Sequence, residues 1–243
     1  MENVIQVREL CAKYDDRLIL DRVTMDVQER EIMVILGGSG CGKSTLLKNI
    51  IRLQQPYSGC VHIFGQDVTN MDEEELTRIL RHLGVMFQYG ALLSSLTVGE
   101  NVALPLQMHT DLSDALVHQI VRTKLHLVEL DHAFSLFPSE LSGGMRKRVA
   151  LARAMALDPK ILFCDEPGAG LDPVTALGID RLLMKLNTDL NMTMVVVTHE
   201  LESIQRISHK VTMLDNGRVL FTGALQDAIK SGIRRIDEFF LQG

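Results

Sequence analysis

The strongest chemical signal in the sequence is a glycine-rich run that ends in a lysine and a serine. Residues 37–44 are Gly-Gly-Ser-Gly-Cys-Gly-Lys-Ser, between an apolar segment at 32–36 and a helical pattern at 43–52. Glycines let the backbone turn tightly and aim N–H groups at a phosphate, while the helix N-terminus and Lys43 add positive charge. The Ser44 hydroxyl can bind Mg²⁺. This order predicts a phosphate-binding loop; the alternative is a glycine-rich turn with a chance lysine.

Two carboxylates end a second apolar segment, at residues 161–164. Ligands of open α/β sheets bind at the carboxyl ends of the strands, so Asp165 and Glu166 are expected beside the phosphates. We expect Asp165 to hold the Mg²⁺ shell and Glu166 to polarise an attacking water. The alternative is a solvated acidic turn.

A histidine follows a third segment, the β-branched run at 193–197. The imidazole of His199 could hydrogen-bond a γ-phosphate oxygen, although a lone histidine is more often structural. Its assignment therefore depends on the other two motifs.

Strands and helices must position these residues. Apolar segments alternate with helical patterns along the chain, which predicts an α/β fold with a largely parallel sheet. From 88 to 157 the strand signal disappears, which predicts a helical insertion with helices near 113–130 and 142–157. A shorter helix is opened by a capping-box spacing from Thr97 to Glu100. The predicted strands and first helix are 31–36, 83–87, 160–164, 193–197 and 43–52.

Composition excludes several classes of protein. The 243 residues are 46% hydrophobic, which is enough for a buried core, and no apolar run approaches the roughly 18 residues of a membrane span. The first residues do not open a signal peptide, and four scattered cysteines predict neither a zinc site nor disulfides, so we expect a reducing, cytoplasmic compartment. A net charge of −6 does not attract nucleic acid or anionic lipid, so any membrane role would come through a partner protein.

One more glycine motif, Leu-Ser-Gly-Gly-Met at 141–145, is called the signature segment below. Ser142 is a good N-cap, and Gly143 and Gly144 expose N–H groups, which makes a second anion cradle. With it, essentially the whole chain resembles the nucleotide-binding domain of ATP-binding cassette (ABC) transporters. The residues that carry this resemblance are Tyr14, 37–44, Gln88, 141–145, 170–173 and His199.

The resemblance implies a P-loop ATPase fold, with a mainly parallel α/β core, an N-terminal antiparallel β part and a helical insertion. It implies one nucleotide-binding domain over 1–243. Within it, the α/β core would occupy about 1–90 and 155–225, the helical subdomain about 91–154 and a tail about 226–243.

The implied activity is ATP hydrolysis with Mg²⁺. Two copies would pair head to tail around two Mg-ATP, each signature segment closing on the other chain's ATP, and would drive a separate multi-spanning membrane permease. Tyr14 would stack on adenine. The implied nucleotide-binding residues are Tyr14, Gly37, Gly38, Ser39, Gly40, Cys41, Gly42, Lys43, Ser44, Thr45, Ser142, Gly143, Gly144 and Asp172. The implied metal ligands are Ser44, Gln88 and Asp165, and the implied catalytic residues are Glu166, His199 and Gln88.

Two departures from the common pattern narrow the resemblance. Met145 replaces the usual signature glutamine, and Gly38 stands where importer-type cassettes commonly have proline. Met145 and the basic run at 146–148, together with the segments 87–92 and 96–106, are similar to the ATPases of the maintenance-of-lipid-asymmetry (Mla) and Mce-associated transporters. This implies movement of phospholipids or other lipids between membranes, from the cytoplasmic face of the inner membrane. An accessory regulatory subunit and an Mce-type substrate-binding protein are further implied partners.

Other functions stay open at this point. Lipoprotein-release and cell-division cassettes are near alternatives within the same class. A soluble ABC ATPase that acts as an assembly scaffold or regulator is an alternative of another class. A P-loop small-molecule kinase is disfavoured, because the signature segment would have no role in it.

Two local features have open assignments as well. The basic residues at 146–148 are expected to form a solvated face, the alternative being that they meet a phosphate or an acidic partner. In the tail, Ile233, Ile236 and Phe240 share one face of a short helix. We expect this face to pack on its own chain, and docking on a partner protein is the alternative.

Overall fold

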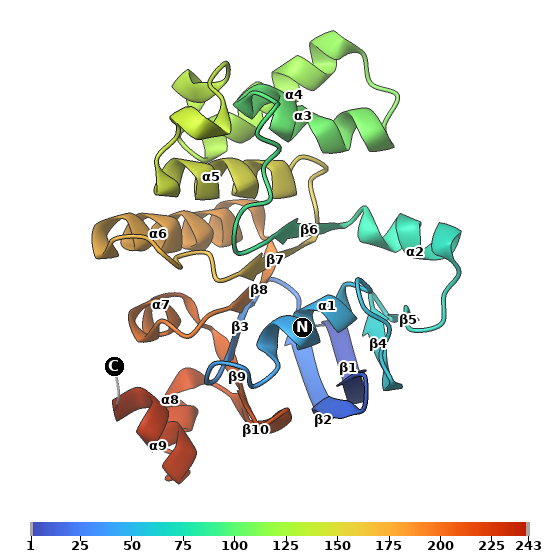
Figure 1. The fold of residues 1–243 in the computed structure, drawn as a ribbon, viewed down its shortest axis with the longest axis vertical. Helices are drawn as coiled ribbons and strands as arrows, with labels where there is room; N and C mark the ends of the chain where they lie inside the picture. Colours follow the sequence, from blue (N-terminus) through green and yellow to red (C-terminus); the bar gives the residue numbers. More distant parts are fainter. Residues whose placement is uncertain (1, 242–243) are drawn as a thin grey trace. The chain divides into compact units, whose positions relative to one another are not determined.

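The computed structural model describes residues 2–241, which divide into two compact units. Unit 1 contains the residues up to Leu80 together with those from Thr193 onward, and unit 2 is Arg81–Met192. Figure 1 labels the elements of both. The predicted helical segment falls in unit 2, which also contains two strands and a long helix assigned above to the α/β core. The single domain over 1–243, with its α/β core, helical subdomain and tail, therefore stays a prediction.

Unit 1 begins with a four-stranded antiparallel sheet, the N-terminal β part that the resemblance implied. In the spatial order β2-β1-β4-β5, its strands are β2 (Arg17–Gln28), β1 (Asn3–Tyr14), β4 (Ser58–Ile63) and β5 (Gln66–Asp67). The β1–β2 register shifts near Glu9, whose backbone is left-handed with φ 47°. Thr24 holds this bulge, because its Oγ1 accepts a hydrogen bond from the Glu9 N–H at 3.0 Å.

The other strands of unit 1 include the two predicted strands that precede the glycine-rich loop and His199. β3 (Ile32–Leu36) lies parallel to β8 (Thr193–Val197) and to β9 (Lys210–Asp215), and β10 (Arg218–Gly223) is antiparallel to β9. Every residue of β3 and β8 is buried, as expected for strands of a parallel sheet that are apolar throughout. Three helices of this unit are α1 (Lys43–Ile50), α2 (Glu73–Leu80) and α7 (Leu201–Ile207).

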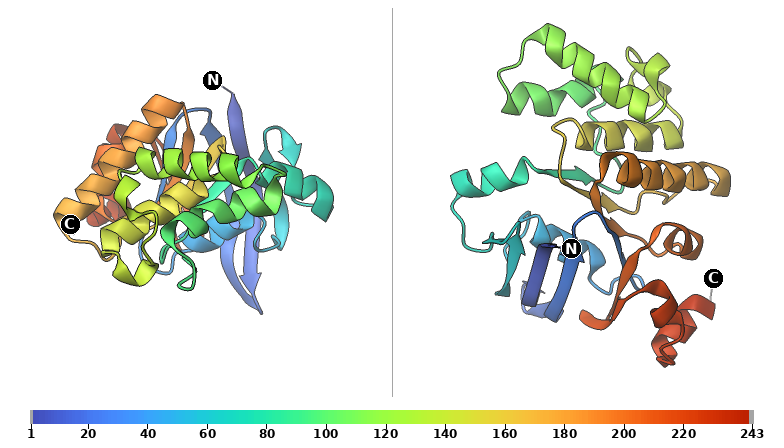
Figure 2. Two further views of the ribbon diagram at one scale, coloured as in Figure 1. Left: turned by 90° about the horizontal axis from the view of Figure 1, so that it is seen from above. Right: turned by 180° about the vertical axis from the view of Figure 1, so that it is seen from behind.

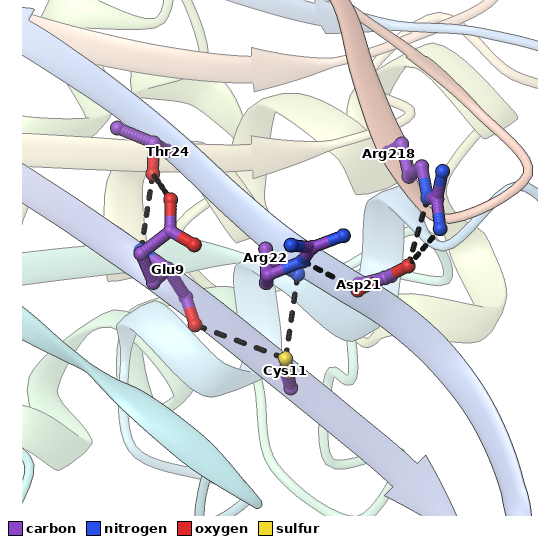
Figure 3. A network of polar contacts seen from close by, with 6 residues as sticks. All are labelled: Glu9, Cys11, Asp21, Arg22, Thr24 and Arg218. Atoms are coloured by element: carbon purple, nitrogen blue, oxygen red, sulfur yellow. Dashed lines mark hydrogen bonds and ion pairs between the residues drawn. The ribbon is translucent and has the colours of Figure 1, made fainter.

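A polar network joins the antiparallel sheet to the β9–β10 hairpin (Figure 3). The Asp21 carboxylate accepts from Arg218 Nε at 2.8 Å, and this guanidinium holds the pKa of Asp21 below its usual value. The neighbouring Arg22 is left-handed, with φ 52°, and donates its N–H to the Cys11 sulfur at 3.3 Å. These contacts fix β2 where it approaches the glycine-rich loop.

Unit 2 contains two parallel strands, β6 (Leu83–Met86) and β7 (Ile161–Asp165), both predicted. Its helices are α3 (Val98–His109), α4 (Asp114–Leu127), η1 (Asp131–Ala133), η2 (Pro138–Glu140), α5 (Gly143–Ala154) and α6 (Pro173–Leu190). α5 packs against α3, α4 and α6. The predicted α/β class, antiparallel N-terminal part and helical segment are therefore confirmed.

The helix starts in unit 2 follow their sequence signals more closely than the helix ends do. The capping box at α3 is present, with Glu100 N–H donating to Thr97 Oγ1 at 3.2 Å and Thr97 N–H donating to Glu100 Oε2 at 2.7 Å. α4 ends before the predicted boundary at 130, because Glu129 takes a left-handed conformation and Leu130 N–H bonds back to Leu125.

α6 has an acidic N-cap. Asp172 Oδ1 accepts from the N–H groups of Val174 and Thr175, both at 3.1 Å, and Thr175 Oγ1 donates to Oδ2 at 2.5 Å. These bonds stabilise the ionised carboxylate, so the pKa of Asp172 lies below its ordinary value of 3.8. The residue expected to bind nucleotide therefore has a capping function within its own chain.

The tail packs on unit 1, as expected. α8 (Leu225–Ile229) contacts β9, β10 and α9 (Arg234–Leu241), and these helices are drawn in red in Figure 2. Ile236 is fully buried, whereas Ile233 and Phe240 are half-buried. Arg235 also lies 3.5 Å from the Asp215 carboxylate. Residues 242 and 243 of the predicted tail lie outside the described residues.

Within the described range, every helix is too short or too polar to cross a bilayer.

Docking of the tail on its own unit predicts that Ile236→Ala lowers the free energy of unfolding by about 2 kcal/mol. That is the low end for truncating a buried isoleucine, because a short terminal helix can partly close the cavity. Leu241→Ala is the matched control, since Leu241 lies on the same helix but is 83% exposed; it should change stability by less than about 0.5 kcal/mol. Urea denaturation of the isolated chain measures both, and equal effects would contradict own-chain docking.

Capping by Asp172 predicts a pH-dependent stability difference between two variants. Asp172→Ala should melt at a lower temperature than the parent at pH 7, and Asp172→Asn, which keeps a capping oxygen, should melt close to it. A lowered folded-state pKa means that the carboxylate's contribution is complete above its unfolded value of 3.8 and is lost as pH falls through the folded value. In thermal melts, the gap between parent and Ala variant should therefore close with acidification. A gap that widened would exclude the cap.

Candidate functional site

The backbone path of the glycine-rich loop depends on two glycines that pack against neighbouring strands. Gly37 has φ 146°, and a Cβ there would meet the Leu214 carbonyl oxygen of β9. Gly42 has φ 106°, and a Cβ there would lie 2.6 Å from the Leu20 side chain of β2. Larger residues at either position would push the loop off the strands. By contrast, Gly38 and Gly40 face open space.

Lys43 folds back over this loop. Its ammonium donates to the carbonyl oxygens of Gly37 at 2.8 Å and Gly38 at 3.0 Å, and the residue is only 8% exposed. The charge is thus held beside the open side of the loop. Neutral carbonyls are weaker partners for an ammonium than a charged phosphate would be.

The start of α1 offers donors to an anion. Gly42 is its N-cap, and among the described residues no side chain caps this end. Ser44 is exposed in the first turn, while Thr45 is buried. A phosphate fits here on three grounds: uncapped helix N–H groups, a nearby ammonium and an open loop surface at 38–40.

Cys41 points the other way. Its thiol is nearly buried, its carbonyl accepts from Gly217 N–H at 3.2 Å, and burial raises the pKa of the thiol. The N–H of Cys41 bonds to Gly38 inside the loop at 3.3 Å. A thiol that stays protonated is not a nucleophile.

The strand register of unit 1 brings His199 to the same sheet edge as the loop. Ile35 of β3 is opposite Val197 of β8, and Thr198 N–H donates to the Ile35 carbonyl at 3.2 Å. His199 and the loop thus both follow the carboxyl ends of neighbouring parallel strands, and His199 is exposed. Tyr14 ends β1 with 46% of its surface exposed, so the side chain is accessible to a ligand.

Unit 2 brings the other predicted groups to a second strand edge. Met86 of β6 is opposite Cys164 of β7, so Gln88 and the carboxylates Asp165 and Glu166 lie at the carboxyl ends of adjacent parallel strands. Both carboxylate residues are 8% exposed, and Glu166 has a left-handed backbone with φ 49°. The solvated acidic turn considered above is therefore wrong, since neither residue is solvated.

The signature segment approaches the α6 cap in unit 2. Ser142 caps α5, with its Oγ accepting from Met145 N–H at 3.2 Å, as predicted. A Cβ on Gly143 would lie 3.2 Å from Leu171, and a Cβ on Gly144 would collide with Thr175. These glycines therefore let the start of α5 pack directly on the segment around Asp172, while Ser142 stays exposed.

A cavity of about 430 Å³ lies within unit 2, between the segments 88–90, 143–147 and 169–171. Its floor includes Lys147, which is 8% exposed. The Lys147 ammonium donates to the carbonyl oxygens of Gln88 at 2.5 Å and Glu166 at 3.0 Å. The expectation of a solvated basic face at 146–148 is therefore wrong for Lys147.

The neighbours of Lys147 differ in their contacts. Arg146 is exposed and donates to the Leu141 carbonyl at 2.6 Å, and Arg148 pairs with Glu129 at 2.7 Å. Burial raises the pKa of the nearby Cys164 thiol to about 12, so that thiol adds no negative charge.

The helical spacing of residues around Lys147 indicates that this lysine is buried, although its charge alone suggests exposure. Gly144, Lys147 and Leu151 are spaced i, i+3 and i+7, which is the buried stripe of α5. A lysine in such a stripe must find polar partners, because an unpaired buried charge is costly.

Comparisons with known proteins show which family the chain belongs to. A profile of the ABC transporter family matches residues 20–169. The intermembrane phospholipid transport ATP-binding protein MlaF of Haemophilus influenzae is 39% identical over 98% of this chain and 90% of its own length. The methionine import ATP-binding protein MetN of that species is 37% identical over the whole chain and 69% of its own length.

Solved structures are similar over nearly their full lengths. The dimeric ATP-binding cassette MJ0796, bound to ADP and Pi, is 34% identical with a TM-score of 0.83, covering 91% of this chain and 98% of its own. CbiO1 of Clostridium perfringens, part of the ABC transporter complex cbiONQ, is 26% identical with a TM-score of 0.86, covering 100% and 99%. With a family match over more than half of its residues and the motifs placed as above, the chain belongs to the ABC transporter family and is an ATP-binding, ATP-hydrolysing subunit that uses Mg²⁺.

Proposed function

We propose that this ATPase drives a membrane permease that moves phospholipids or other lipids between membranes, from the cytoplasmic face of the inner membrane. One observation carries the lipid assignment: the MlaF relative matches nearly end to end, over 98% of this chain and 90% of its own length. MetN is almost as identical, but this chain spans only 69% of it. Methionine import is therefore the second candidate.

In the proposed reaction, the loop at 37–42, Lys43 and the first turn of α1 bind the phosphates, and Tyr14 stacks on adenine. Ser44, Gln88 and Asp165 supply the hydroxyl, amide and carboxylate oxygens that Mg²⁺ prefers. The bound metal would neutralise charge that develops on the phosphates.

The proposed chemistry is carried by two further side chains. Glu166 accepts a proton from the attacking water, and His199 donates a hydrogen bond to a γ-phosphate oxygen. Phosphoryl transfer needs little covalent help from a protein, so positioning and charge stabilisation account for the rate.

We further propose a head-to-tail dimer. Each chain has two anion cradles, at α1 and at α5, but one lysine loop. In the proposed dimer, Ser142, Gly143 and Gly144 of one copy close on the ATP held by Lys43 of the other, near the capped start of α6 at Asp172. The dimeric state of the similar cassette MJ0796 supports this arrangement.

Two substitutions separate nucleotide binding from hydrolysis. Lys43→Ala should abolish productive ATP binding, because the loop loses its full positive charge. Glu166→Gln should still bind ATP but turn over about 10²- to 10⁴-fold more slowly, the usual effect of losing a general base. Binding of a fluorescent ATP analogue and release of phosphate measure the two effects. If Glu166→Gln hydrolysed ATP at the parent rate, Glu166 would not be the base.

The same Glu166→Gln chain should accumulate as an ATP-bound dimer in size-exclusion chromatography. Lys43→Ala serves as the control and should stay monomeric with ATP present. A Glu166→Gln chain that stayed monomeric with saturating ATP would contradict the dimer.

The proposed partner and cargo are tested by purification of the tagged chain from its native membranes in detergent. A multi-spanning permease should copurify, and phospholipid rather than methionine should stimulate ATP hydrolysis of the reconstituted complex. Leu93→Glu should weaken capture, since Leu93 is 45% exposed in the segment after Gln88 that faces the permease in this family. Leu190→Glu, at an equally exposed leucine outside that segment, is the control.

Two outcomes would contradict this assignment, and a third would contradict the docking segment alone. Stimulation by methionine alone would favour the import function. Capture of soluble proteins without a permease would favour the scaffold function. Equal capture by both leucine variants would remove the proposed docking segment.

A further inference from the structure

Lys147 connects two loops that the proposed mechanism uses separately. Its ammonium donates to the backbone carbonyl of Gln88 at 2.5 Å and to that of Glu166 at 3.0 Å, from a side chain that is almost completely buried. An ammonium has three N–H donors and no acceptor, so it suits carbonyl oxygens that converge from different loops. Charge-assisted bonds of this kind are stronger than neutral ones.

The backbone at Glu166 requires such support. A φ of 49° places this non-glycine residue in the left-handed region, which costs free energy and persists only where surrounding contacts over-determine it. The Glu166 carbonyl accepts from Lys147 and also from Ala169 N–H, at 3.2 Å. Lys147 thus helps to hold the peptide that sets the direction of the Glu166 side chain.

The loop after β6 is held by the same face of α5. Arg153 donates to the carbonyl oxygens of Gly90 at 2.7 Å and Ala91 at 2.8 Å, and a Cβ on Gly90 would lie 3.3 Å from the Ala150 methyl group. Lys147, Ala150 and Arg153 are spaced i, i+3 and i+6, so one stripe of the helix contacts the loop between positions 88 and 91. Arg153 contacts this loop, whereas Lys147 contacts Glu166 as well.

We propose that Lys147 is a positioning residue for ATP hydrolysis, which fixes the backbones of Glu166 and Gln88 to helix α5 and so aims the general base at its water. This inference rests on the proposed roles of Glu166 and Gln88. Because α5 begins at the signature segment, the helix that offers the second anion cradle also sets the orientation of the base. Lys147 touches neither water nor nucleotide in this role.

The test replaces the ammonium by an apolar chain of similar length. Lys147→Met should lower kcat at least tenfold while the KM for ATP changes less than threefold. The groups proposed to bind adenine and the phosphates, Tyr14 and the glycine-rich loop with its lysine, belong to unit 1, whereas the Lys147 ammonium bonds to carbonyls of unit 2. Lys147→Arg should recover part of kcat, because a guanidinium also reaches two carbonyls, as Arg153 does. Amide hydrogen exchange should rise at 88–91 and 165–169 in the Met variant, without a global increase.

Lys124→Met is the matched control for the loss of a buried charge. Lys124 is 5% exposed and pairs with Asp158, which precedes β7, whereas both loops follow the other ends of β6 and β7. Its variant should therefore keep the parent kcat even if it melts at a lower temperature. If Lys147→Met does not fold, Lys147→Gln, which keeps two N–H donors, replaces it with the same expected direction.

Parallel measurement of Glu166→Gln separates the two levels of inference. If Glu166→Gln is slow but Lys147→Met has the parent kcat, the positioning role is overturned and the base remains. Equal losses of kcat in Lys147→Met and Lys124→Met would also overturn it, as general destabilisation. A Glu166→Gln chain with parent turnover would overturn the proposed base itself, and the positioning role with it.

Discussion

The close packing of a backbone loop on two strands is the constraint on which the phosphate-binding unit depends. A loop that binds phosphate through its N–H groups cannot rely on side chains to hold its shape. Here the shape comes from Gly37 against the Leu214 carbonyl and from Gly42 against Leu20. Because Leu214 belongs to β9 and Leu20 to β2, contacts with both strands fix the conformation of the loop. The pair of Asp21 and Arg218 joins β2 to β10, which is the antiparallel neighbour of β9.

Unit 2 is constrained differently, because it holds charged side chains in a buried position. Asp165, Glu166 and Lys147 are each 8% exposed, in a region where an unpaired charge would be costly. Carbonyl oxygens of two loops satisfy the ammonium, and the ammonium in turn stabilises the left-handed peptide at Glu166. The same hydrogen bonds therefore offset the cost of burying the Lys147 charge and the cost of the left-handed backbone at Glu166. Strained backbone at functional sites is commonly held by surrounding contacts in this way.

Small residues make the second cradle possible as well. Gly143 and Gly144 allow α5 to start against the segment 171–175, where a methyl group at position 144 would already collide. The Asp172 carboxylate caps α6 by accepting three hydrogen bonds from Val174 and Thr175. A residue assigned to nucleotide binding by resemblance therefore also holds the surface on which the signature segment rests.

The sequence by itself determined the local features of this protein. The positions of β3, β6, β7, β8 and α1 and of the α-helices between 97 and 154 followed from apolar periodicity and caps, and the phosphate loop followed from its glycines, because all of these depend on neighbours within a few residues. The N-terminal antiparallel sheet was implied only by the family resemblance, and α6 was not predicted. Contacts between distant segments were decided by tertiary structure. The basic residues 146–148 look alike in sequence, yet Lys147 is buried and Arg146 is exposed, since the helix turns only one of them toward the loops after β6 and β7. Likewise, the sequence did not identify which surface covers the apolar face of the tail, because the hydrophobic effect favours burial without specifying the partner. The structure identifies it, since Ile236 is buried within unit 1.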